Sequence, residues 1–326
     1  MKLLVFFLLS LSALTVPAVP RAETLVTPAW VKAEMDSAQR RLVIVEASWA
    51  KLADAKDYRA GHVPGAVHLN TDELEDGYPT WHLRSPRELR RVIGALGITP
   101  ETTVIVYSQQ AIAAARAWWV LLYAGVKDVR LMNGGFAAWQ AAGYPVETKI
   151  NEPTPQRFTA RVNEQWRATT AYVKTRLHSR HTQLADARSR EEFIGAVSGY
   201  DYMDVKGRLP GAVPIGNADD AARVYVSADG TLREPRDILK QWQAVGLALD
   251  KREVVFYCGS GWRSSLTFLY AWLLGFERIR NYSDGWSGWS TVYVRDAKAR
   301  GGTPGWRQQR TAHPIVRGVP RVRTGK

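Results

Sequence analysis

The sequence predicts an α/β protein of two tandem domains, each a parallel sheet with helices on both faces. Two observations lead to this prediction. The chain has 326 residues, which exceeds one typical domain and suits two. Its halves also repeat the same motifs in the same order, and within each half short apolar runs alternate with helical patterns.

The N-terminus is expected to be removed as a signal peptide of residues 1–22. Lys2 precedes a short apolar run that begins at Leu3, and either Ala18 or Ala22 could precede the cut. A basic start, a short apolar stretch and small residues are typical of a secretory signal. An uncleaved anchor is less favoured because spanning a bilayer takes about 20 apolar residues. We expect export to a bacterial periplasm and no integral membrane span.

Five ordered matches support the duplication. Residues 44–48, 62–67, 104–108, 123–126 and 133–139 match residues 184–188, 208–213, 254–258, 273–276 and 283–289. A repeat of this length is a domain and not the unit of a solenoid. We therefore expect a first domain at 23–150, a linker at 151–163 and a second domain at 164–300.

Strands and helices follow from the same pattern. Residues 104–107 are apolar, too short for an amphipathic helix and preceded by a turn signal at 99–101, so they predict a buried strand. Residues 111–123 have the composition of a helix that ends at Gly125. In the second half, 253–257 predict a strand and 264–274 the helix that follows it.

The net charge of +13 is concentrated near the C-terminus, where residues 301–326 predict a mobile basic tail. A basic tail could bind an anionic surface or nucleic acid, but a solvated extension is the simpler interpretation. Export also argues against nucleic acid as a partner.

The single cysteine, Cys258, follows the strand 253–257 and opens a loop before a helix. Ligands of α/β sheets bind beyond the carboxyl ends of strands. Gly259 and Gly261 let the backbone curl so that N–H groups face an anion, and the helix N-terminus adds its dipole. We expect a reactive thiolate at Cys258. The expected anion nest consists of Gly259, Ser260, Gly261, Trp262, Arg263 and Ser264. Nothing in the sequence indicates a metal site or a cofactor.

This strand, cysteine loop and helix, the Pro-Gly-Ala turns at 64–66 and 210–212, and the endings at 133–139 and 283–289 resemble the rhodanese superfamily over about residues 25–295. The resemblance implies a flavodoxin-like fold in each half and a catalytic cysteine in the second half only. Ser108, Ala113 and Ser48 stand where the second half has Cys258, Arg263 and Arg188. The first domain is therefore expected to be inactive.

The resemblance also implies a reaction. Cys258 to Arg263 form a Cys-X4-Arg loop, whereas the related Cdc25-type phosphatases and arsenate reductases use the wider Cys-X5-Arg, so a phosphatase is disfavoured. Residues 258–261 resemble the loop of mercaptopyruvate sulfurtransferases, and Trp262-Arg263 resembles exported sulfurtransferases of the YnjE type. The chain is thus expected to move sulfur from thiosulfate or 3-mercaptopyruvate, through a Cys258 persulfide, to a thiol or cyanide.

Further roles rest on the same resemblance. Arg188 and Arg263 are expected to bind the donor, although Arg188 could instead form a salt bridge to Asp186 or Glu191. Ser260, His62 and Asp54 could form a serine-protease-like relay, but we favour a simple turn hydrogen bond for His62. A different function is also open, a persulfide carrier that serves a protein partner such as a thiol-containing redox protein.

Overall fold

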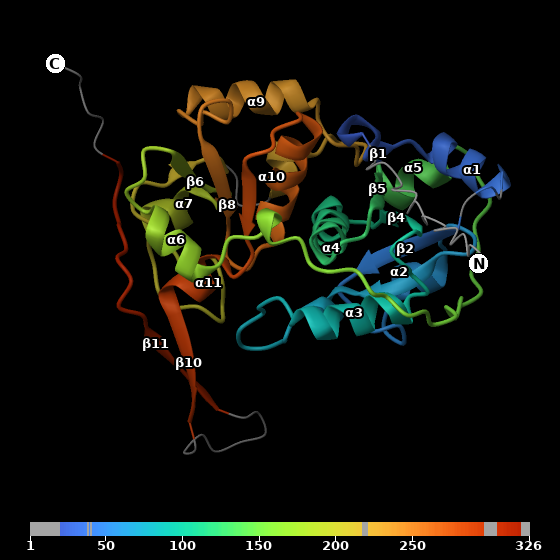
Figure 1. Cartoon of the computed structure of the whole chain (residues 1–326), viewed down its shortest axis with the longest axis horizontal. Helices are drawn as coiled ribbons and strands as arrows, with labels where there is room; N and C mark the ends of the chain where they lie inside the picture. The colour runs from blue at the N-terminus through green and yellow to red at the C-terminus, as the bar shows by residue number, and fades with distance from the viewer. Residues whose placement is uncertain (1–19, 38, 40, 217–220, 297–304, 321–326) are drawn as a thin grey trace, which may run out of the picture.

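The structure is a computed structural model that describes residues 20–37, 39, 41–216, 221–296 and 305–320. It confirms the predicted α/β class, because two parallel sheets lie side by side and helices cover both faces of each (Figure 1). The first sheet has the order β1 (Leu25–Val26), β5 (Asp128–Met132), β4 (Thr103–Tyr107), β2 (Leu42–Ser48), β3 (Val67–Asn70). The second has the order β7 (Val213–Pro214), β6 (Thr182–Asp186), β8 (Glu253–Tyr257), β9 (Ile279–Tyr282).

The two sheets share one topology. The order β5-β4-β2-β3 of the first corresponds to β9-β8-β6-β7 of the second, and every neighbouring pair is parallel. Equivalent strands also pair at equivalent positions, since Ile44 lies opposite Ile105 and Leu184 opposite Val255. The repeat in the sequence is therefore a repeat of the fold.

Alternate residues of the central strands face different helix layers. In β4, Val104 and Val106 belong to the apolar cluster that includes α3 (Pro86–Ala95) and α4 (Ala111–Ala124). Ile105 belongs to the cluster on the other face with α1 (Pro28–Ser37) and α5 (Gly135–Ala141). Burial on both faces explains why these strands are continuous apolar runs.

The second sheet is covered in the same way. Phe256 packs with α9 (Pro235–Ala244) and α10 (Trp262–Leu273), while Val255 packs with α6 (Thr170–Arg176) and α11 (Gly285–Ser290). The shorter helices are η1 (Arg21–Glu23), α2 (Lys56–Ala60), η2 (Thr71–Leu74), η3 (Glu164–Trp166), α7 (Arg190–Ile194) and α8 (Ala221–Tyr225). No helix among the described residues is long and apolar enough to cross a membrane.

Helices α4 and α10 lie side by side between the sheets (Figure 1). Trp118 and Trp119 of α4 are fully buried, and both contact Phe268 of α10. One continuous apolar cluster therefore runs through both domains. The linker 151–163 lies along the first domain, where Gln156 N donates to Gly94 O at 2.8 Å.

The predicted mobile tail needs correction for residues 305–320. Strand β11 (Trp306–Arg310) pairs antiparallel with β10 (Thr291–Arg295), and this hairpin projects from the second domain (Figure 1). Farther along, Val316 forms a bridge with Arg208, and His313 packs on Trp289. Backbone pairing and this ring contact hold the segment on the second domain. The rest of the predicted tail, and residues 1–19 of the predicted signal peptide, lie outside the described residues.

Candidate active site

The loop that carries Cys258 joins the end of β8 to the start of α10 and is held from behind by α11. Trp286 N donates to Cys258 O at 2.7 Å, and Ser287 N donates to Gly259 O at 3.0 Å. A Cβ at Gly285 would lie 2.6 Å from both carbonyl oxygens, so only glycine allows this approach. Because the two carbonyls point toward α11, the loop can turn amide groups toward the sulfur.

Cys258 lies in this loop, and the residue is 1% exposed. Gly261 N donates to Sγ at 3.2 Å, and Ser264 Oγ lies 3.6 Å from it while donating to Asn281 Oδ1 at 2.7 Å. Helix α10 begins at Trp262, directly after Gly261. The positive end of the helix dipole therefore lies next to the sulfur. Of the predicted nest, Gly261 and Ser264 contact the sulfur, while Gly259 N donates to Tyr200.

Tyr200, which the sequence did not indicate, covers the loop. Its hydroxyl oxygen accepts a hydrogen bond from Gly259 N at 3.2 Å and another from Arg263 Nη2. Its ring occupies the space where a Cβ at Gly259 would lie. Burial raises the pKa of Tyr200, so the side chain stays a neutral phenol at pH 7. Two groups expected to bind a donor's oxygens thus already contact the phenol.

Arg263 lies in the loop but is paired with Glu192. Its Nη1 and Nη2 contact the two carboxylate oxygens at 2.7 and 2.8 Å, a bidentate arrangement. Burial works to raise the pKa of Glu192, but the guanidinium groups of Arg263 and Arg188 together hold it below its usual value. Glu192 also caps α7 with Ser189, and the Ser-X-X-Glu spacing was the signal that could have drawn attention to it.

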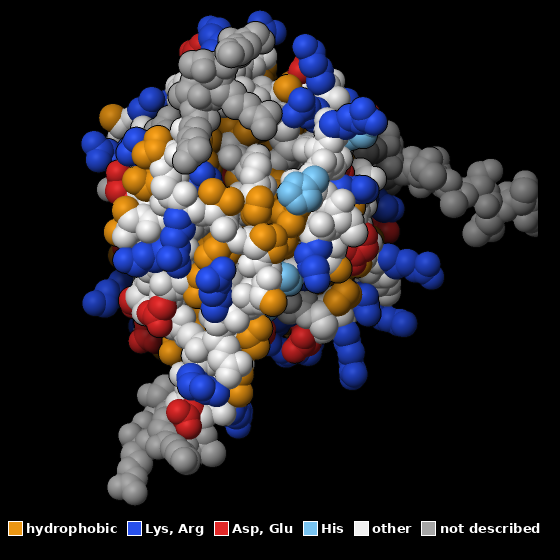
Figure 2. Space-filling model, turned by 90° about the vertical axis from the view of Figure 1, so that its left-hand side faces the viewer, with side chains coloured by type: hydrophobic (Ala, Val, Ile, Leu, Met, Phe, Trp, Pro, Cys, Tyr) orange, Lys and Arg blue, Asp and Glu red, His pale blue; other side chains and the backbone are white. Residues whose placement is uncertain are grey.

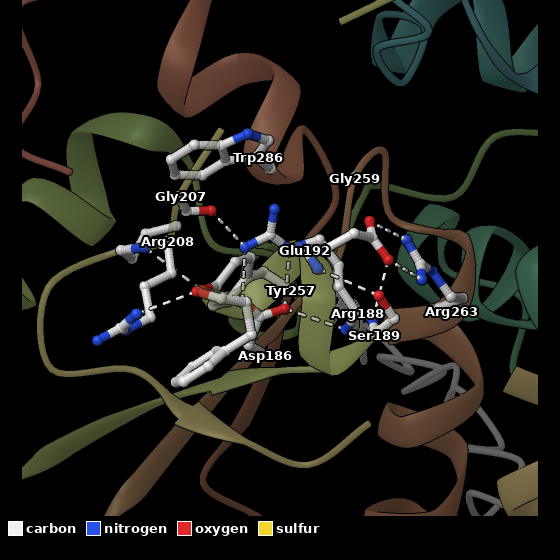
Figure 3. A network of polar contacts seen from close by, with 12 residues as sticks. Asp186, Arg188, Ser189, Glu192, Gly207, Arg208, Tyr257, Gly259, Arg263 and Trp286 are labelled. Carbon is white, nitrogen blue, oxygen red and sulfur yellow. Dashed lines mark hydrogen bonds and ion pairs between the residues drawn. The ribbon is translucent and has the colours of Figure 1, made fainter. Parts of the chain in front are cut away.

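Arg188 is fully buried and lies among the groups shown in Figure 3. Its Nε and Nη2 contact the Asp186 carboxylate at 2.9 and 2.7 Å, and Nη2 also donates to Gly207 O at 2.8 Å. Tyr257 donates to the same carboxylate at 2.6 Å. Arg188 does not line the pocket described below. Of the two predicted roles, the contacts present are those of the salt bridge to Asp186.

The relay of Ser260, His62 and Asp54 is not assembled. His62 is buried, stacks on Tyr58 with ring centroids 3.9 Å apart, and contacts Asn151 through Nε2 at 3.3 Å. Asp54 is exposed, and Ser260 lies in the pocket beside Tyr202. The Nδ1 of His62 also lies 2.7 Å from Tyr58 O, so His62 contacts the helix before the turn and the linker. The predicted turn hydrogen bond stays a prediction.

A cavity of about 1100 Å³ opens above the cysteine loop, between the two domains. Ser260, Trp262 and Arg263 of the loop line it. The first domain contributes Trp49, Asp72, Glu75, Tyr78, Trp81 and Ile112. The second domain further contributes Ser189, Glu191, Glu192, Val197, Gly199, Tyr200, Asp201 and Tyr202. The inactive domain therefore builds one wall of the site.

The first domain also holds the loop directly. Trp262 Nε1 donates to Glu75 Oε1 at 2.8 Å, and Arg116 of α4 contacts the same oxygen through Nη2 at 2.8 Å. Burial raises the pKa of Glu75 to about 7, although Arg116 opposes the shift. Arg116 further donates to Ser283 Oγ at 3.0 Å. The sequence analysis did not single out Arg116. The available signal was that Arg116 is the only charged residue in the apolar segment 111–124.

No group of three or more His, Cys, Asp and Glu side chains in the described part of the chain could hold a metal ion. The site is thus described by its cysteine loop, its ion pairs and its aromatic walls.

Comparison with known proteins places this geometry in a family. The rhodanese-like domain model matches residues 27–142 and 169–291, which is more than half of the chain. The thiosulfate sulfurtransferase YnjE of Escherichia coli is 36% identical over 83% of this chain and 64% of its own length. The chain thus spans slightly less than two thirds of that relative. A solved structure of YnjE superposes with a TM-score of 0.77, covering 93% of this chain and 70% of the other.

Two other relatives have different described roles. The sulfur carrier protein TtuD of Thermus thermophilus is 28% identical over 83% of this chain and 94% of its own length. The anaerobic ergothioneine biosynthesis enzyme of Chlorobium limicola, solved with its natural substrate trimethyl histidine, is 29% identical with a TM-score of 0.77, covering 91% of this chain and 71% of its own. The chain therefore belongs to the rhodanese-like family, in the tandem-domain group that includes the thiosulfate sulfurtransferase YnjE.

Proposed function

We propose that the chain is a sulfurtransferase that carries sulfur on Cys258 as a persulfide. The observation that supports this most directly is the environment of Sγ, with an amide hydrogen bond from Gly261 and the N-terminus of α10 directed at one buried sulfur. Such a setting lowers the energy of an anionic sulfur before and after it gains a second sulfur atom. The similarity to thiosulfate sulfurtransferases supports the same chemistry.

The proposed reaction is a double displacement. The Cys258 thiolate attacks the outer sulfur of thiosulfate, a bond forms between the two sulfurs, and the bond to the sulfonate sulfur breaks with its electron pair, releasing sulfite. A thiolate or cyanide then attacks the outer sulfur of the persulfide. The product leaves as a new persulfide or as thiocyanate, and Cys258 returns as a thiolate. Each step transfers one sulfur atom and needs no external oxidant.

Donor loading requires a small rearrangement. Tyr200 occupies Gly259 N and Arg263, and the Arg263 guanidinium is already paired with Glu192. We propose that the sulfonate of thiosulfate, or the carboxylate of 3-mercaptopyruvate, displaces the Tyr200 hydroxyl and accepts these hydrogen bonds. Ser260 lies at the same wall and would contact the donor beside Tyr202.

The test is the intact mass of the purified protein after incubation with thiosulfate and, separately, with 3-mercaptopyruvate. A gain of about 32 Da that cyanide or a thiol removes is the expected sign of covalent sulfur transfer. The faster donor identifies the subclass. Cys258→Ser is the control and should show no gain with either donor. Persistent absence of a sulfur adduct on the wild-type protein would refute the proposal.

A persulfide carrier for a protein partner is the second candidate, and the described role of TtuD favours it. In this case Cys258 would load with sulfur and discharge slowly to small acceptors. The discharge rates to cyanide, to small thiols and to a reduced dithiol redox protein separate the two functions. Because a relative has trimethyl histidine as its substrate, this compound belongs in the same acceptor series.

Export to the periplasm is proposed from the predicted signal peptide. Arg21 Nη1 donates to Phe276 O, and its guanidinium carbon lies 4.2 Å from the centroid of the Trp272 ring. A mature chain that keeps Arg21 would keep these contacts. This favours the cut after Ala18 over the cut after Ala22. N-terminal sequencing of the protein from a periplasmic extract tests both the location and the cut.

A further inference from the structure

The pocket over Cys258 differs in charge from the rest of the molecule. The chain carries a net charge of +13, and Lys and Arg side chains are widespread over the face of the second domain in Figure 2. Five carboxylate side chains line the pocket, namely Asp72, Glu75, Glu191, Glu192 and Asp201. Among the described residues that line it, Arg263 is the only cationic one. An acidic cavity in a basic protein needs an explanation.

The two cations close to the site do not neutralise it. Arg263 forms a bidentate ion pair with Glu192. Arg116 lies behind the pocket wall and forms an ion pair with Glu75. Neither Asp72, Glu191 nor Asp201 forms an ion pair within the described residues. Three negative groups therefore remain available to a ligand.

Asp72 shows this most clearly. Its Oδ1 is buried and has no hydrogen-bond partner among the described residues. Burial raises the pKa of Asp72, while a side-chain hydrogen bond with Trp49 and the charge of Lys51 act in the opposite direction. The hydrogen bond with Trp49 leaves Oδ1 as the oxygen without a partner. A buried oxygen without a donor is costly unless a ligand or water supplies one. Its position in the pocket wall makes a ligand's donor a suitable partner.

Aromatic rings stand beside this carboxylate. The ring of Trp49 lies 6.0 Å from that of Trp81 at 89° and 6.3 Å from that of Trp262 at 55°. The three indoles are inclined to one another and form walls instead of a parallel stack. Trp49 is 67% exposed, which is unusual for so large an apolar side chain. Indole faces with adjacent carboxylates bind ammonium groups, since the ring quadrupole and the negative charge attract the same cation.

We propose that this pocket selects a cationic sulfur acceptor, a molecule that bears a protonated or quaternary amine close to its sulfur-accepting atom. The amine would contact the unpartnered Oδ1 of Asp72 and the indole faces of Trp49 and Trp81, and the accepting atom would face the persulfide on Cys258. The same carboxylates oppose a dianionic donor such as thiosulfate, so the selectivity concerns the second half of the reaction. This inference rests on the proposed persulfide chemistry and specifies its acceptor.

The experiment separates loading from discharge. Cys258 is first loaded with thiosulfate, or with inorganic polysulfide if thiosulfate is slow, and the mass gain is verified. Failure of both donors counts against the persulfide itself. The loaded protein is then mixed in single-turnover reactions with cysteamine, 2-mercaptoethanol or 3-mercaptopropionate, whose charges are positive, neutral and negative. Rates are expressed per thiolate concentration, which corrects for the ionised fraction. They are then divided by the rates of the same thiolates toward a small persulfide in solution, which corrects for intrinsic nucleophilicity.

We expect cysteamine to discharge the persulfide at least about tenfold faster than 3-mercaptopropionate at low ionic strength, and the ratio to fall as salt is added. Asp72→Asn and Trp49→Ala should each reduce the ratio by about threefold because each removes one attraction for the amine. Glu101→Gln, an exposed carboxylate remote from the pocket, is the matched control and should keep the wild-type ratio. Equal rates for the three thiols, or an unchanged ratio in Asp72→Asn, would overturn the proposal.

Discussion

The two domains have the same fold but different chemistry at the same place in it. After β8 the second domain has Cys258 and the helix α10, and after β4 the first has Ser108 and the helix α4. Both loops are held from behind by a glycine that leaves no room for a Cβ, Gly285 against Cys258 O and Gly135 against Ser108 O. The backbone scaffold of the site is thus conserved between the halves of the chain, whereas the reacting group is present in one.

Each half also has a buried carboxylate at the same position of a repeated strand, and the two carboxylates have different partners. At equivalent positions of β6 and β2, Asp186 pairs with Arg188 and Glu46 pairs with His68 at 2.7 Å. Ser48 stands where the second domain has Arg188 and lies 3.4 Å from Glu46. Each half has its own way to satisfy a buried carboxylate. The comparison shows that the fold maintains a buried carboxylate in each half and compensates it with a different side chain. The binding role of Arg188 stays a prediction, and its Nη1 is buried without a hydrogen-bond partner among the described residues.

The largest expected effect on sulfur transfer comes from moving the cysteine from the second domain to the first. Cys258→Ser should lower sulfur transfer at least about 1000-fold, because the nucleophile is lost. Adding Ser108→Cys to this variant should not restore it, since the loop after Ser108 lacks the glycines at 259 and 261 and the arginine at 263. Persulfide formation is followed by intact mass. A sulfur adduct on the moved cysteine would mean that the scaffold alone suffices.

Arg188→Ser places the residue of the first domain into the second. Removing one partner of a buried ion pair should lower the free energy of unfolding by about 3–5 kcal/mol, because Asp186 is left uncompensated. Urea unfolding measures this loss, with Arg87→Ser at an exposed position as the arginine control. If Arg188 acts mainly through Asp186, the KM for thiosulfate of the folded variant should stay near wild type. A large rise in KM without loss of stability would restore the substrate-binding role.

Glu75→Gln tests how strongly the first domain supports the loop of the second. The pKa of Glu75 in the fold is raised to about 7, so the folded chain binds this proton more tightly than the unfolded chain. Stability from this group is therefore present below its unfolded pKa and is lost as pH rises through about 7, a change on the order of 2 kcal/mol. Denaturant unfolding at several pH values should show a smaller fall in the glutamine variant. Parallel pH curves for both proteins would contradict the shift.

Tyr200→Phe should change the rate of sulfur loading least among these variants. It tests the phenol that covers the cysteine loop of the second domain. Without the hydroxyl, Gly259 N and Arg263 no longer donate to a phenol, while the ring still packs over the loop. We expect sulfur loading from thiosulfate to become about two- to fivefold faster, since one hydrogen-bond exchange is removed. Stopped-flow measurement of sulfite release gives the rate. Slower loading would show that Tyr200 assists the donor.

The fold and the reacting loop were accessible from sequence because they depend on local signals. Strands such as 253–257 are continuous apolar runs, and the turn after them is marked by Gly259 and Gly261. Because the motifs occur twice in the same order, the sequence also predicts one parallel sheet in each half. The family resemblance added the expected roles of residues that local signals cannot assign.

The walls of the pocket were not accessible in this way. Glu75 lies far from Cys258 in the sequence, and its contact with Trp262 exists only because the two domains pack together. Tyr200 comes from a loop without regular structure between α7 and β7, so no periodicity marks it. The sequence shows the charge of Arg188 but not its burial beside Asp186, so it left open whether this arginine binds substrate or forms a salt bridge.

The shared apolar layer of α4 and α10 has a consequence for how molecules reach the sulfur. Opening the cleft by rotating one domain away from the other would expose Trp118, Trp119 and Phe268, which are fully buried. Exposing side chains of this size costs about 1.5–3 kcal/mol each, so a hinge motion of the whole domain is unfavourable. Substrates would then reach Cys258 when side chains at the pocket entrance move, while the two domains keep their relative positions. Side-chain rotations at the entrance are faster than domain motions, so the entrance can open and close many times within one domain movement.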